Sequence, residues 1–354
     1  MNYSKSFLAV MAMTAISLGA AADDVNYKLV WNDEFNGSAL DTRAWNIEVN
    51  GDGGGNNELQ YYRSENVSLG TDSATGAHCL ILTAKKESYS GKSFTSGRVN
   101  TSAKAAFKHG KIESRIKFPK TANGLWPAFW MLGSDYGTVG WPRCGEIDIV
   151  EMGNSQGIKY GTQDRFFNGA CHWGFYNDQG QYPNYARSTT NSYSLQDGEF
   201  HTFTLEWDDD YLSMYLDKDK YPNEEPYYKM GVSDYSGDWA TGNYFHHEFF
   251  VVYDLAIGGN FTGIWSTGGI TALADGEAQM LVDWVRVYQD ENDLSATATI
   301  PEGYSAGVTT VAVDENNAQQ PTIIYDALGK IVNEMSHGMY IVKTGNVVKK
   351  IFKR

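Results

Sequence analysis

Three acidic residues stand within six positions in the segment Glu146-Ile-Asp-Ile-Val-Glu151. Side chains alternate between the two faces of a β-strand, so Glu146 and Asp148 are predicted to share one face while their apolar neighbours enter a core. On a regular strand Glu151 falls on the opposite face, because it lies five positions after Glu146. One extra residue in a β-bulge, at Ile149 or Val150, brings all three carboxyl groups to the same side.

Crowded carboxyl groups raise one another's pKa values, so that one group keeps its proton while another is ionised. Hydrolysis of a glycosidic bond uses this combination, since an ionised carboxylate attacks the anomeric carbon and a carboxylic acid protonates the leaving oxygen. With the bulge, we expect the outer two carboxyl groups to be about 5–5.5 Å apart, the separation typical of double-displacement glycosidases. The spacing alone fits equally well with a solvated acidic edge strand that discourages aggregation.

The elements that must position these acids are predicted to be strands. Short runs rich in β-branched and aromatic residues recur between Gly, Asn and Asp clusters, as at Leu80–Thr83, Thr202–Trp207 and Phe249–Val252. A helical period of apolar residues is hardly visible after the first residues, and turn-forming stretches such as Asn50–Gly55 punctuate the chain. The sequence therefore predicts an all-β fold, a sandwich or jelly roll.

The segment Trp141-Pro-Arg-Cys-Gly-Glu-Ile-Asp-Ile-Val-Glu-Met resembles the signature of family 16 glycoside hydrolases. The resemblance implies that Glu146 is the nucleophile, Glu151 the general acid/base, and Asp148 a helper that orients and modulates the nucleophile. The two residues between Asp148 and Glu151 are similar to the bulged form of the laminarinase, agarase and carrageenase branches. Other laminarinase-like segments are Trp31–Phe35, Asn56–Tyr62, Thr95–Arg98, Gly124–Trp130, His172-Trp173, Gly258–Phe261 and Val282–Tyr288.

This coverage, from about Val30 to Tyr288, implies the curved, concanavalin A-like β-sandwich jelly roll of the family and a long substrate cleft. Sugar rings stack on indole faces without requiring charge, so tryptophans near the acids are candidate sugar platforms, whereas Trp130, Trp207 and Trp284 are expected in the core. The resemblance and this reasoning together give the expected substrate-binding residues, which are Trp126, Trp141, His172, Trp173, Arg98, Asn57, Glu58 and Asn260.

No cofactor is expected for catalysis, but a structural calcium ion is. Glu34 and Asp283 resemble positions near a calcium site of many family members, and oxygen ligands suit that ion. Cys79, Cys144 and Cys171 fit no zinc-ligand spacing. A Cys144–Cys171 pair requires neighbouring strands, and buried thiols are the favoured alternative.

The two ends of the chain differ from its middle. Residues 1–22 resemble a signal peptide, with Lys5, an apolar run and small residues before Asp23, and predict a secreted or cell-surface protein without a membrane span. We assign residues 23–290 to the catalytic domain, 291–308 to a polar linker and 309–354 to a small C-terminal β module. That module resembles sorting modules of type IX secretion, which implies secretion machinery as a partner; an accessory module that packs on the catalytic domain or binds glycan is the alternative.

The formal net charge of −15 argues against nucleic acid and polyanionic substrates and is compatible with a neutral glucan. The favoured hypothesis is an endo-acting retaining hydrolase of β-1,3-glucan or mixed-linkage β-1,3/1,4-glucan. The second hypothesis is a noncatalytic glucan-binding protein. The presence of both glutamates argues against it, because such a protein does not require them. The third keeps the chemistry and changes the substrate to agarose or carrageenan, and the acidic chain disfavours the sulfated polymer.

Overall fold

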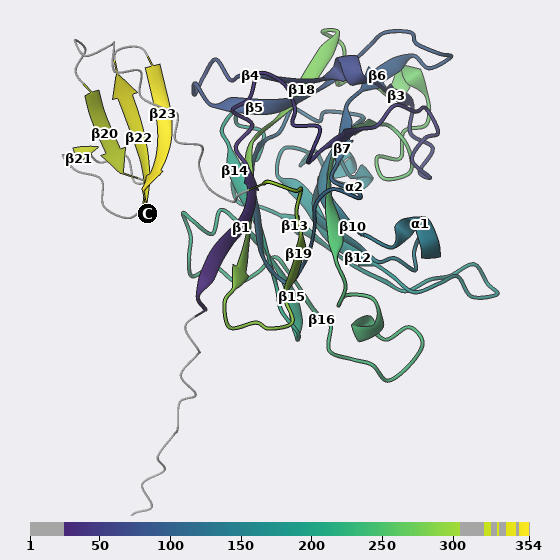
Figure 1. The fold of residues 1–354 in the computed structure, drawn as a ribbon. Coiled ribbons are helices and arrows are strands. Elements are labelled where there is room, and N and C mark those ends of the chain that lie inside the picture. The colour runs from purple at the N-terminus through teal and green to yellow at the C-terminus, as the bar shows by residue number, and fades with distance from the viewer. Residues whose placement is uncertain (1–24, 305–321, 327–330, 333–337, 345–346, 354) are drawn as a thin grey trace, which may run out of the picture.

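The computed structural model describes residues 25–304, 322–326, 331–332, 338–344 and 347–353. Strands dominate these residues and form sheets of ten, nine and four strands (Figure 1). Buried side chains from both larger sheets form one main hydrophobic core. The two larger sheets therefore make a sandwich, and the predicted all-β jelly-roll class is confirmed.

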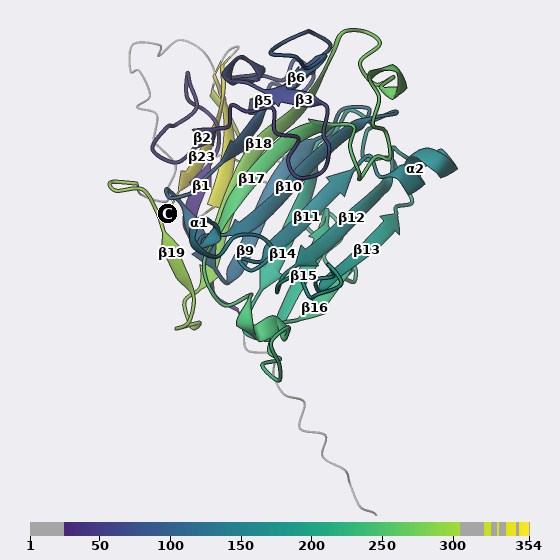
Figure 2. The ribbon, with the colours of Figure 1, turned by 90° about the vertical axis from the view of Figure 1, so that its right-hand side faces the viewer.

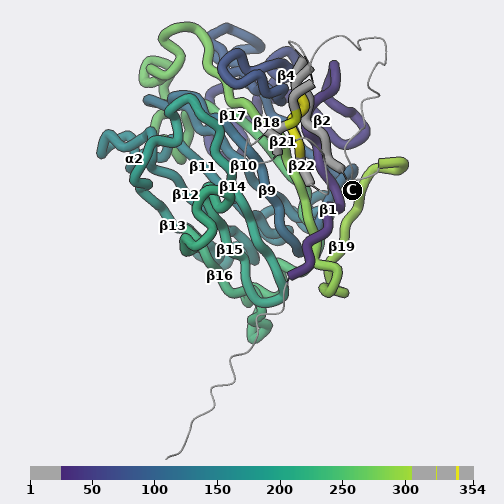
Figure 3. Tube along the Cα trace, turned by 90° about the vertical axis from the view of Figure 1, so that its left-hand side faces the viewer, coloured from purple at the N-terminus to yellow at the C-terminus, as the bar shows by residue number. Residues whose placement is uncertain are grey.

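The ten-stranded sheet is seen in Figure 3 and joins strands from both halves of the chain. Its path runs β16 (Tyr228–Gly231), β15 (Tyr211–Leu216), β14 (His201–Trp207), β9 (Gly110–Lys117), β18 (Glu277–Asp290), β5 (His78–Lys85), β6 (Phe94–Ser96) and β3 (Gln60–Tyr62). Off this path, β1 (Tyr27–Asp33) pairs with β18 and β4 (Val67–Thr71) pairs with β5.

The other large sheet carries the acidic strand at its centre, where β17, β10, β11, β12 and β13 run side by side (Figure 2). Its path runs β13 (Asn184–Thr190), β12 (Phe166–His172), β11 (Glu146–Met152), β10 (Leu125–Gly133), β17 (Phe249–Ile257), β7 (Arg98–Asn100) and β2 (Asn46–Ile47). Off this path, β8 (Ala106–Lys108) pairs with β17 and with β19 (Thr297–Thr299).

Helical structure within the described residues is confined to short segments between strands. They are α1 (Tyr136–Val139), α2 (Ser155–Tyr160), η1 (Ser64–Asn66), η2 (Thr241–Asn243) and η3 (Thr267–Gly269). The side chain of Asn154 caps α2 by accepting a hydrogen bond from the backbone N–H of Gln156 at 2.8 Å, and Gly161 ends this helix in the left-handed conformation. No helix among the described residues is long and apolar enough to cross a membrane.

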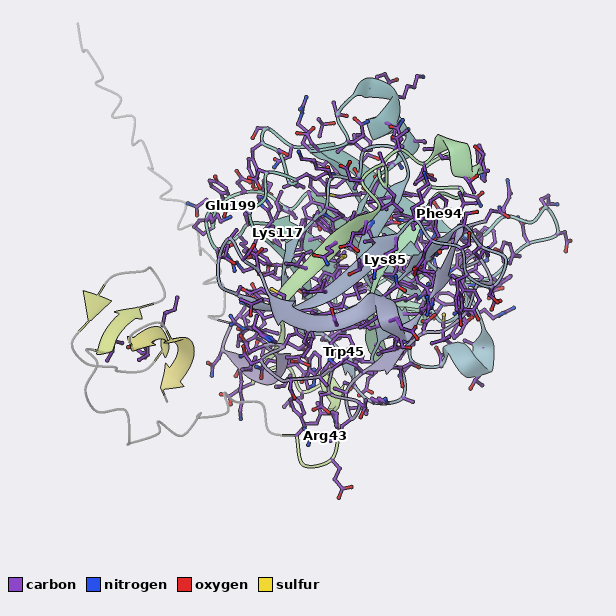
Figure 4. The ribbon with its side chains drawn as sticks, turned by 90° about the horizontal axis from the view of Figure 1, so that it is seen from above. Arg43, Trp45, Lys85, Phe94, Lys117 and Glu199 are labelled. Carbon is purple, nitrogen blue, oxygen red and sulfur yellow. The ribbon has the colours of Figure 1, made fainter. Side chains whose placement is uncertain are left out.

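Alternation along β10 separates the core from the chemistry. Leu125, Phe129 and Met131 are fully buried in the main core, whereas Trp126 and Trp130 point to the other side of the sheet. Seen from above, side chains fill the body of the sandwich, with Trp45 inside it and Glu199 at its rim (Figure 4). We call the side of the nine-stranded sheet that turns away from the main core the acid face, because it carries Glu146, Asp148 and Glu151.

Residues 291–304 correct the predicted linker, because they pack on the sandwich. β19 pairs antiparallel with β8, and the ring of Tyr304 lies 6.1 Å from that of Trp31. The Tyr304 hydroxyl also donates to the carbonyl of Asn32. All three residues of β19 are exposed, so this edge strand is as polar as a linker and composition alone did not distinguish the two.

The remaining predictions on the chain ends concern few described residues. The signal peptide at 1–22 and residues 305–321 lie outside them. Within the predicted C-terminal module, β20 (Thr322–Asp326), β21 (Ile331–Val332), β22 (Gly338–Thr344) and β23 (Val347–Lys353) form an antiparallel sheet of their own. All three cysteines are buried thiols, as favoured over a disulfide.

Candidate active site

The predicted bulge is present in β11. The partners of Asp148 and Glu151 on β12 are two positions apart, so two residues of β11 face a single residue of β12. Those two residues, Ile149 and Val150, both belong to the main core. The Tyr227 hydroxyl donates to the carbonyl of Ile149, which satisfies a polar group at the irregular position. This shift of register places all three carboxyl groups on the acid face.

A tryptophan indole donates to each of the outer glutamates. Trp141 Nε1 donates to Glu146 Oε2 at 3.0 Å, and Trp126 Nε1 donates to Glu151 Oε1 at 3.0 Å. The ring of Trp126 is itself held by stacking on Phe261, with ring centroids 4.7 Å apart. Since χ rotation of either glutamate would break its hydrogen bond, the two carboxyl groups are fixed before substrate binds.

Asp148 lies between the outer glutamates in sequence and is only 6 % exposed. Its Oδ2 atom is buried, has no hydrogen-bond donor among the described residues, and lies 3.5 Å from His172 Nε2. Burial raises the pKa of Asp148 well above its usual range, and the charges of Glu146 and Glu151 raise it further. Burial and the two neighbouring glutamates thus both favour the protonated form of Asp148.

The outer glutamates are shifted in the same direction. Burial raises the pKa of Glu146 and of Glu151 above that of an exposed glutamate, and each indole hydrogen bond opposes the rise. The charge of Arg98 also lowers the pKa of Glu146, whereas the charge of Glu146 raises the pKa of Glu151. The surroundings therefore favour an ionised Glu146 beside a protonated Glu151.

His172 is placed beside the acids by β12, as predicted. Its Nε2 lies 4.0 Å from Glu146 Oε1, and its Nδ1 lies 3.1 Å from the hydroxyl of Tyr182. Burial lowers the pKa of His172 to about 4. The imidazole is thus neutral near pH 7 and forms no ion pair with the acids there.

A family model supports this geometry. The model described as "Glycosyl hydrolases family 16" matches residues 34–237, more than half of the chain. The chain belongs to glycosyl hydrolase family 16. The predicted family, and with it the prediction that the protein is a glycoside hydrolase, is confirmed.

Relatives of this family 16 chain match at similar levels of identity. It is 36% identical to the glucan endo-1,3-beta-glucosidase of Cryptopygus antarcticus, across 73% of this chain and 88% of that protein. It is 33% identical to the clotting factor G alpha subunit of Tachypleus tridentatus, but spans only 40% of that protein's length. A solved structure, the family 16 enzyme of the Bacteroides ovatus mixed linkage glucan PUL in complex with G4G4G3G product, is 38% identical with a TM-score of 0.63, covering 72% of this chain and 98% of that one.

A second polar network on the acid face is built around Asp254 of β17. Trp130 Nε1 donates to Asp254 Oδ1 at 2.6 Å, and the Arg98 guanidinium lies 5.0 Å from the Trp130 ring centroid. Arg98 is itself paired with Glu48 at 3.0 Å. Burial raises the pKa of Asp254 to about 7, which the charge of Arg98 opposes. Trp130 therefore belongs to the site of this family 16 enzyme and not to the core, contrary to expectation.

Glu58 is a buried neighbour of this network. It is 5 % exposed, and its Oε2 accepts hydrogen bonds from Gln60 Nε2 at 2.5 Å and from the Tyr62 hydroxyl at 3.1 Å. The Tyr62 hydroxyl also lies 3.4 Å from Asp254 Oδ2. The expectation that Glu58 contacts sugar is corrected, because a carboxylate turned inward to these donors positions Asp254 instead.

Asn57 and Asn260, two of the predicted sugar contacts, lie together although they are far apart in sequence. Asn57 Nδ2 donates to Asn260 Oδ1 at 3.0 Å, and Trp265 Nε1 donates to the same oxygen at 3.0 Å. The Trp265 side chain is 61% exposed, which leaves its ring free to stack on a sugar. Sequence reasoning missed Trp265, because it is a single tryptophan in a loop of small residues.

Trp141 also belongs to an aromatic group that sequence reasoning missed in part. Its ring lies 4.8 Å from Tyr182 and 5.9 Å from Tyr176, and Tyr176 is 51% exposed. Both tyrosines lie in the loop between β12 and β13, close in sequence to His172. A signal was available, since loops next to a rigid catalytic strand often carry binding residues.

The expectation for Trp173 is wrong in position. It follows His172 directly, so its side chain turns to the opposite side and joins the main core. Its Nε1 donates to the carbonyl of Trp239 at 2.7 Å, and its ring packs edge-on against Phe245. These contacts leave Trp173 no access to the acid face.

The proposed calcium ligands do not fit that ion. Both Glu34 oxygens are held by Arg286, at 2.7 and 2.9 Å, and Asp283 lies 2.6 Å from Arg115. A cation placed on these oxygens would have to displace two guanidinium groups. The sequence prediction missed these ion pairs. Arg115 on β9 and Arg286 on β18 are brought to the two acids only by the pairing of the strands.

We predict that Asp148→Asn stabilises the fold at alkaline pH. Because the folded pKa of Asp148 is raised, the unfolded chain releases this proton first, and wild-type stability falls as pH rises from about 4 through the raised pKa. Asparagine has no such proton. The free energy of unfolding of the variant, relative to that of the wild type, should therefore be higher at pH 8 than at pH 4, as measured by denaturant unfolding. Asp275→Asn, at an exposed turn, is the control. Equal effects at both pH values would refute the raised pKa.

Proposed function

We propose that this family 16 chain is a retaining endo-β-glucanase that cuts internal bonds of β-1,3- or mixed-linkage β-1,3/1,4-glucan. The observation that carries the proposal is the bulge of β11, which puts Glu146 and Glu151 on one face with an indole donor each. A noncatalytic binding protein needs neither the bulge nor two buried glutamates of raised pKa. The chemistry below follows from these residues.

In the first step the ionised Glu146 attacks the anomeric carbon, and Glu151 gives its proton to the oxygen of the departing glucan chain. The Trp141 indole stabilises the charge on Glu146 until the covalent glycosyl-enzyme forms. Glu151, now ionised, takes a proton from water, which attacks the same carbon and releases Glu146. Each step balances, because the proton lost from Glu151 is regained from that water.

Asp148 and His172 act on this chemistry without reacting. The raised pKa of Asp148, on the same face as Glu146, favours its neutral form and so limits the negative charge beside the nucleophile. The neutral His172 beside both carboxyl groups adds no positive charge that would pair with Glu146. The nucleophile therefore stays reactive toward the sugar.

The substrate class follows from the charge and the aromatic side chains. Trp141, Tyr176 and Trp265 offer ring faces for pyranoses. Arg98 is already paired with Glu48, and the chain carries a net charge of −15, which disfavours sulfated galactans. The endo action and the two linkages are supported by the relatives, one named for β-1,3 bonds and one solved with a mixed-linkage product.

We also propose that the protein is exported, on the strength of the signal-like residues 1–22. The basic strand β23 and the sheet to which it belongs support a role for residues 309–354 as a sorting module. The accessory glycan-binding alternative predicts that this module alone is retained on insoluble glucan. Secretion assays with and without residues 309–354 separate the two.

The test of function is product analysis after incubation with laminarin, barley β-glucan, agarose and carrageenan. We expect oligosaccharides from the first two and none from the galactans. Glu146→Gln and Glu151→Gln should each melt no lower than the wild type and lower the rate at least about a hundredfold, the lower range for losing an acid/base group. Glu277→Gln, at an exposed end of β18, is the control. Near-normal rates in either active-site variant would contradict the assignment.

The indole donors give a matched pair of pH predictions. A hydrogen bond to the ionised form lowers a carboxyl pKa, so its removal raises that pKa. Trp141→Phe should move the acidic limb of the kcat/KM profile up by about 1 pH unit, because Glu146 then ionises later. Trp126→Phe should move the alkaline limb up instead, since Glu151 then keeps its proton longer. Downward shifts, or the same limb moving in both variants, would contradict the roles.

A further inference from the structure

Away from the three acids, two histidines and an aspartate converge from separate turns of the sandwich. His109 joins β8 to β9, Asp209 lies in the turn between β14 and β15, and His246 lies between η2 and β17. His109 Nε2 is 3.0 Å from His246 Nδ1, and Asp209 Oδ1 is 3.7 Å from the first atom and 3.9 Å from the second. These three atoms could hold one metal ion between them.

The outward nitrogen of each imidazole fixes where its proton sits. His246 Nε2 lies 2.9 Å from the carbonyl oxygen of Val232, which can only accept, so this nitrogen carries the hydrogen. His109 Nδ1 lies 3.0 Å from Asp293 Oδ2 and 3.0 Å from Ser295 Oγ. The Asp293 carboxylate can only accept, so His109 Nδ1 is a donor as well, while the Ser295 hydroxyl lies 2.8 Å from Asp293 Oδ1 and 3.3 Å from Asp209 Oδ1.

It follows that the two nitrogens facing each other, His109 Nε2 and His246 Nδ1, both carry lone pairs. Two lone pairs 3.0 Å apart repel, unless a cation lies between them. The carboxylate of Asp209 adds a third electron-pair donor on the same side. The arrangement thus demands either a shared proton or a metal ion.

We propose that His109, His246 and Asp209 form a zinc site. The proposed glucanase mechanism does not use this site. Two imidazole nitrogens and one carboxylate oxygen are a common zinc donor set, whereas calcium prefers oxygen alone. An ion about 2.0–2.1 Å from each nitrogen spans the 3.0 Å gap at an angle of roughly 91–97°. The Asp293–His109 contact supplies the outer carboxylate that orients a metal-bound histidine.

The ion would link three separate turns of the sandwich through three protein ligands. His109 is fully buried, and its ring packs edge-on against Trp207 at 5.2 Å, while the ring of His246 stacks on Tyr235. The Asp209 side chain is 71 % exposed, which leaves the remaining coordination position open to water. Zinc would therefore tie the turn at Asp209 and the loop at His246 to the β8–β9 corner, and through Asp293 to the segment that leads into β19.

The test uses the full chain, stripped with EDTA and then titrated with zinc sulfate in a calorimeter. We expect one zinc per chain and a rise in melting temperature of about 4–8 °C at a hundredfold excess over Kd. Asp209→Asn should weaken binding at least about tenfold, and His246→Gln should abolish it and the thermal shift. Asp210→Asn, on the same exposed turn, removes the same charge and should bind zinc as the wild type does.

Three results would overturn the proposal. No saturable binding to the wild type would mean that a shared proton separates the two imidazoles. Unchanged zinc affinity in both Asp209→Asn and His246→Gln would exclude these ligands. Zinc binding that is lost in His172→Gln but kept in His246→Gln would place the metal on Glu146, Asp148 and His172, the other group of suitable ligand spacing among the described residues. Because hydrolysis is not the readout, failure here leaves the proposed glucanase function untouched.

Discussion

The bulge in β11 is the constraint on which the site depends. A regular strand would send Glu151 into the core, where an acid without a donor is costly, and would leave Glu146 without a partner across the glycosidic bond. Two apolar residues at the bulge, Ile149 and Val150, anchor the strand to the main core on one side. The hydroxyl of Tyr227 donates to the backbone carbonyl of Ile149, so core packing and this hydrogen bond together stabilise the bulge.

Burial of several acids on one face costs stability, and the acids differ in how many hydrogen bonds offset that cost. Glu146 and Glu151 each receive an indole hydrogen bond, and Asp254 receives one from Trp130. Asp148 has a buried oxygen without a donor among the described residues. Local strain of this kind is typical of functional sites, where stability is lost in exchange for reactivity. Catalysis requires Glu146 and Glu151 to differ in pKa, so that one is ionised while the other keeps its proton. The hydrogen-bond donors and the neighbouring charges set that difference.

Local rules were sufficient for much of this structure. Alternation and spacing predicted the β class, the shared face of Glu146 and Asp148, and the bulge that brings in Glu151. The same rule, applied one residue further to His172-Trp173, would have placed Trp173 in the core, where it lies. The prediction for Trp173 was wrong because His172 and Trp173 were taken as one motif, whereas adjacent positions of a strand face opposite sides of the sheet.

What the sequence could not supply are contacts between distant segments. The pairing of Asp283 with Arg115 and of Glu34 with Arg286 depends on the register of β18 with β9 and β1. The support of Asp254 by Glu58, through Tyr62, likewise joins residues almost two hundred positions apart. Strand pairing of this range has no local signal, since each partner looks like an ordinary surface charge in its own segment.

The most direct measurement is proton NMR of the anomeric signals in the first minutes of glucan hydrolysis. If the bulge holds Glu146 close enough to form a covalent glycosyl-enzyme, the configuration is inverted twice and the β-anomer appears first, followed by slow mutarotation. The α-anomer as the first product would mean that water attacks directly, and Glu146 could then not be the nucleophile.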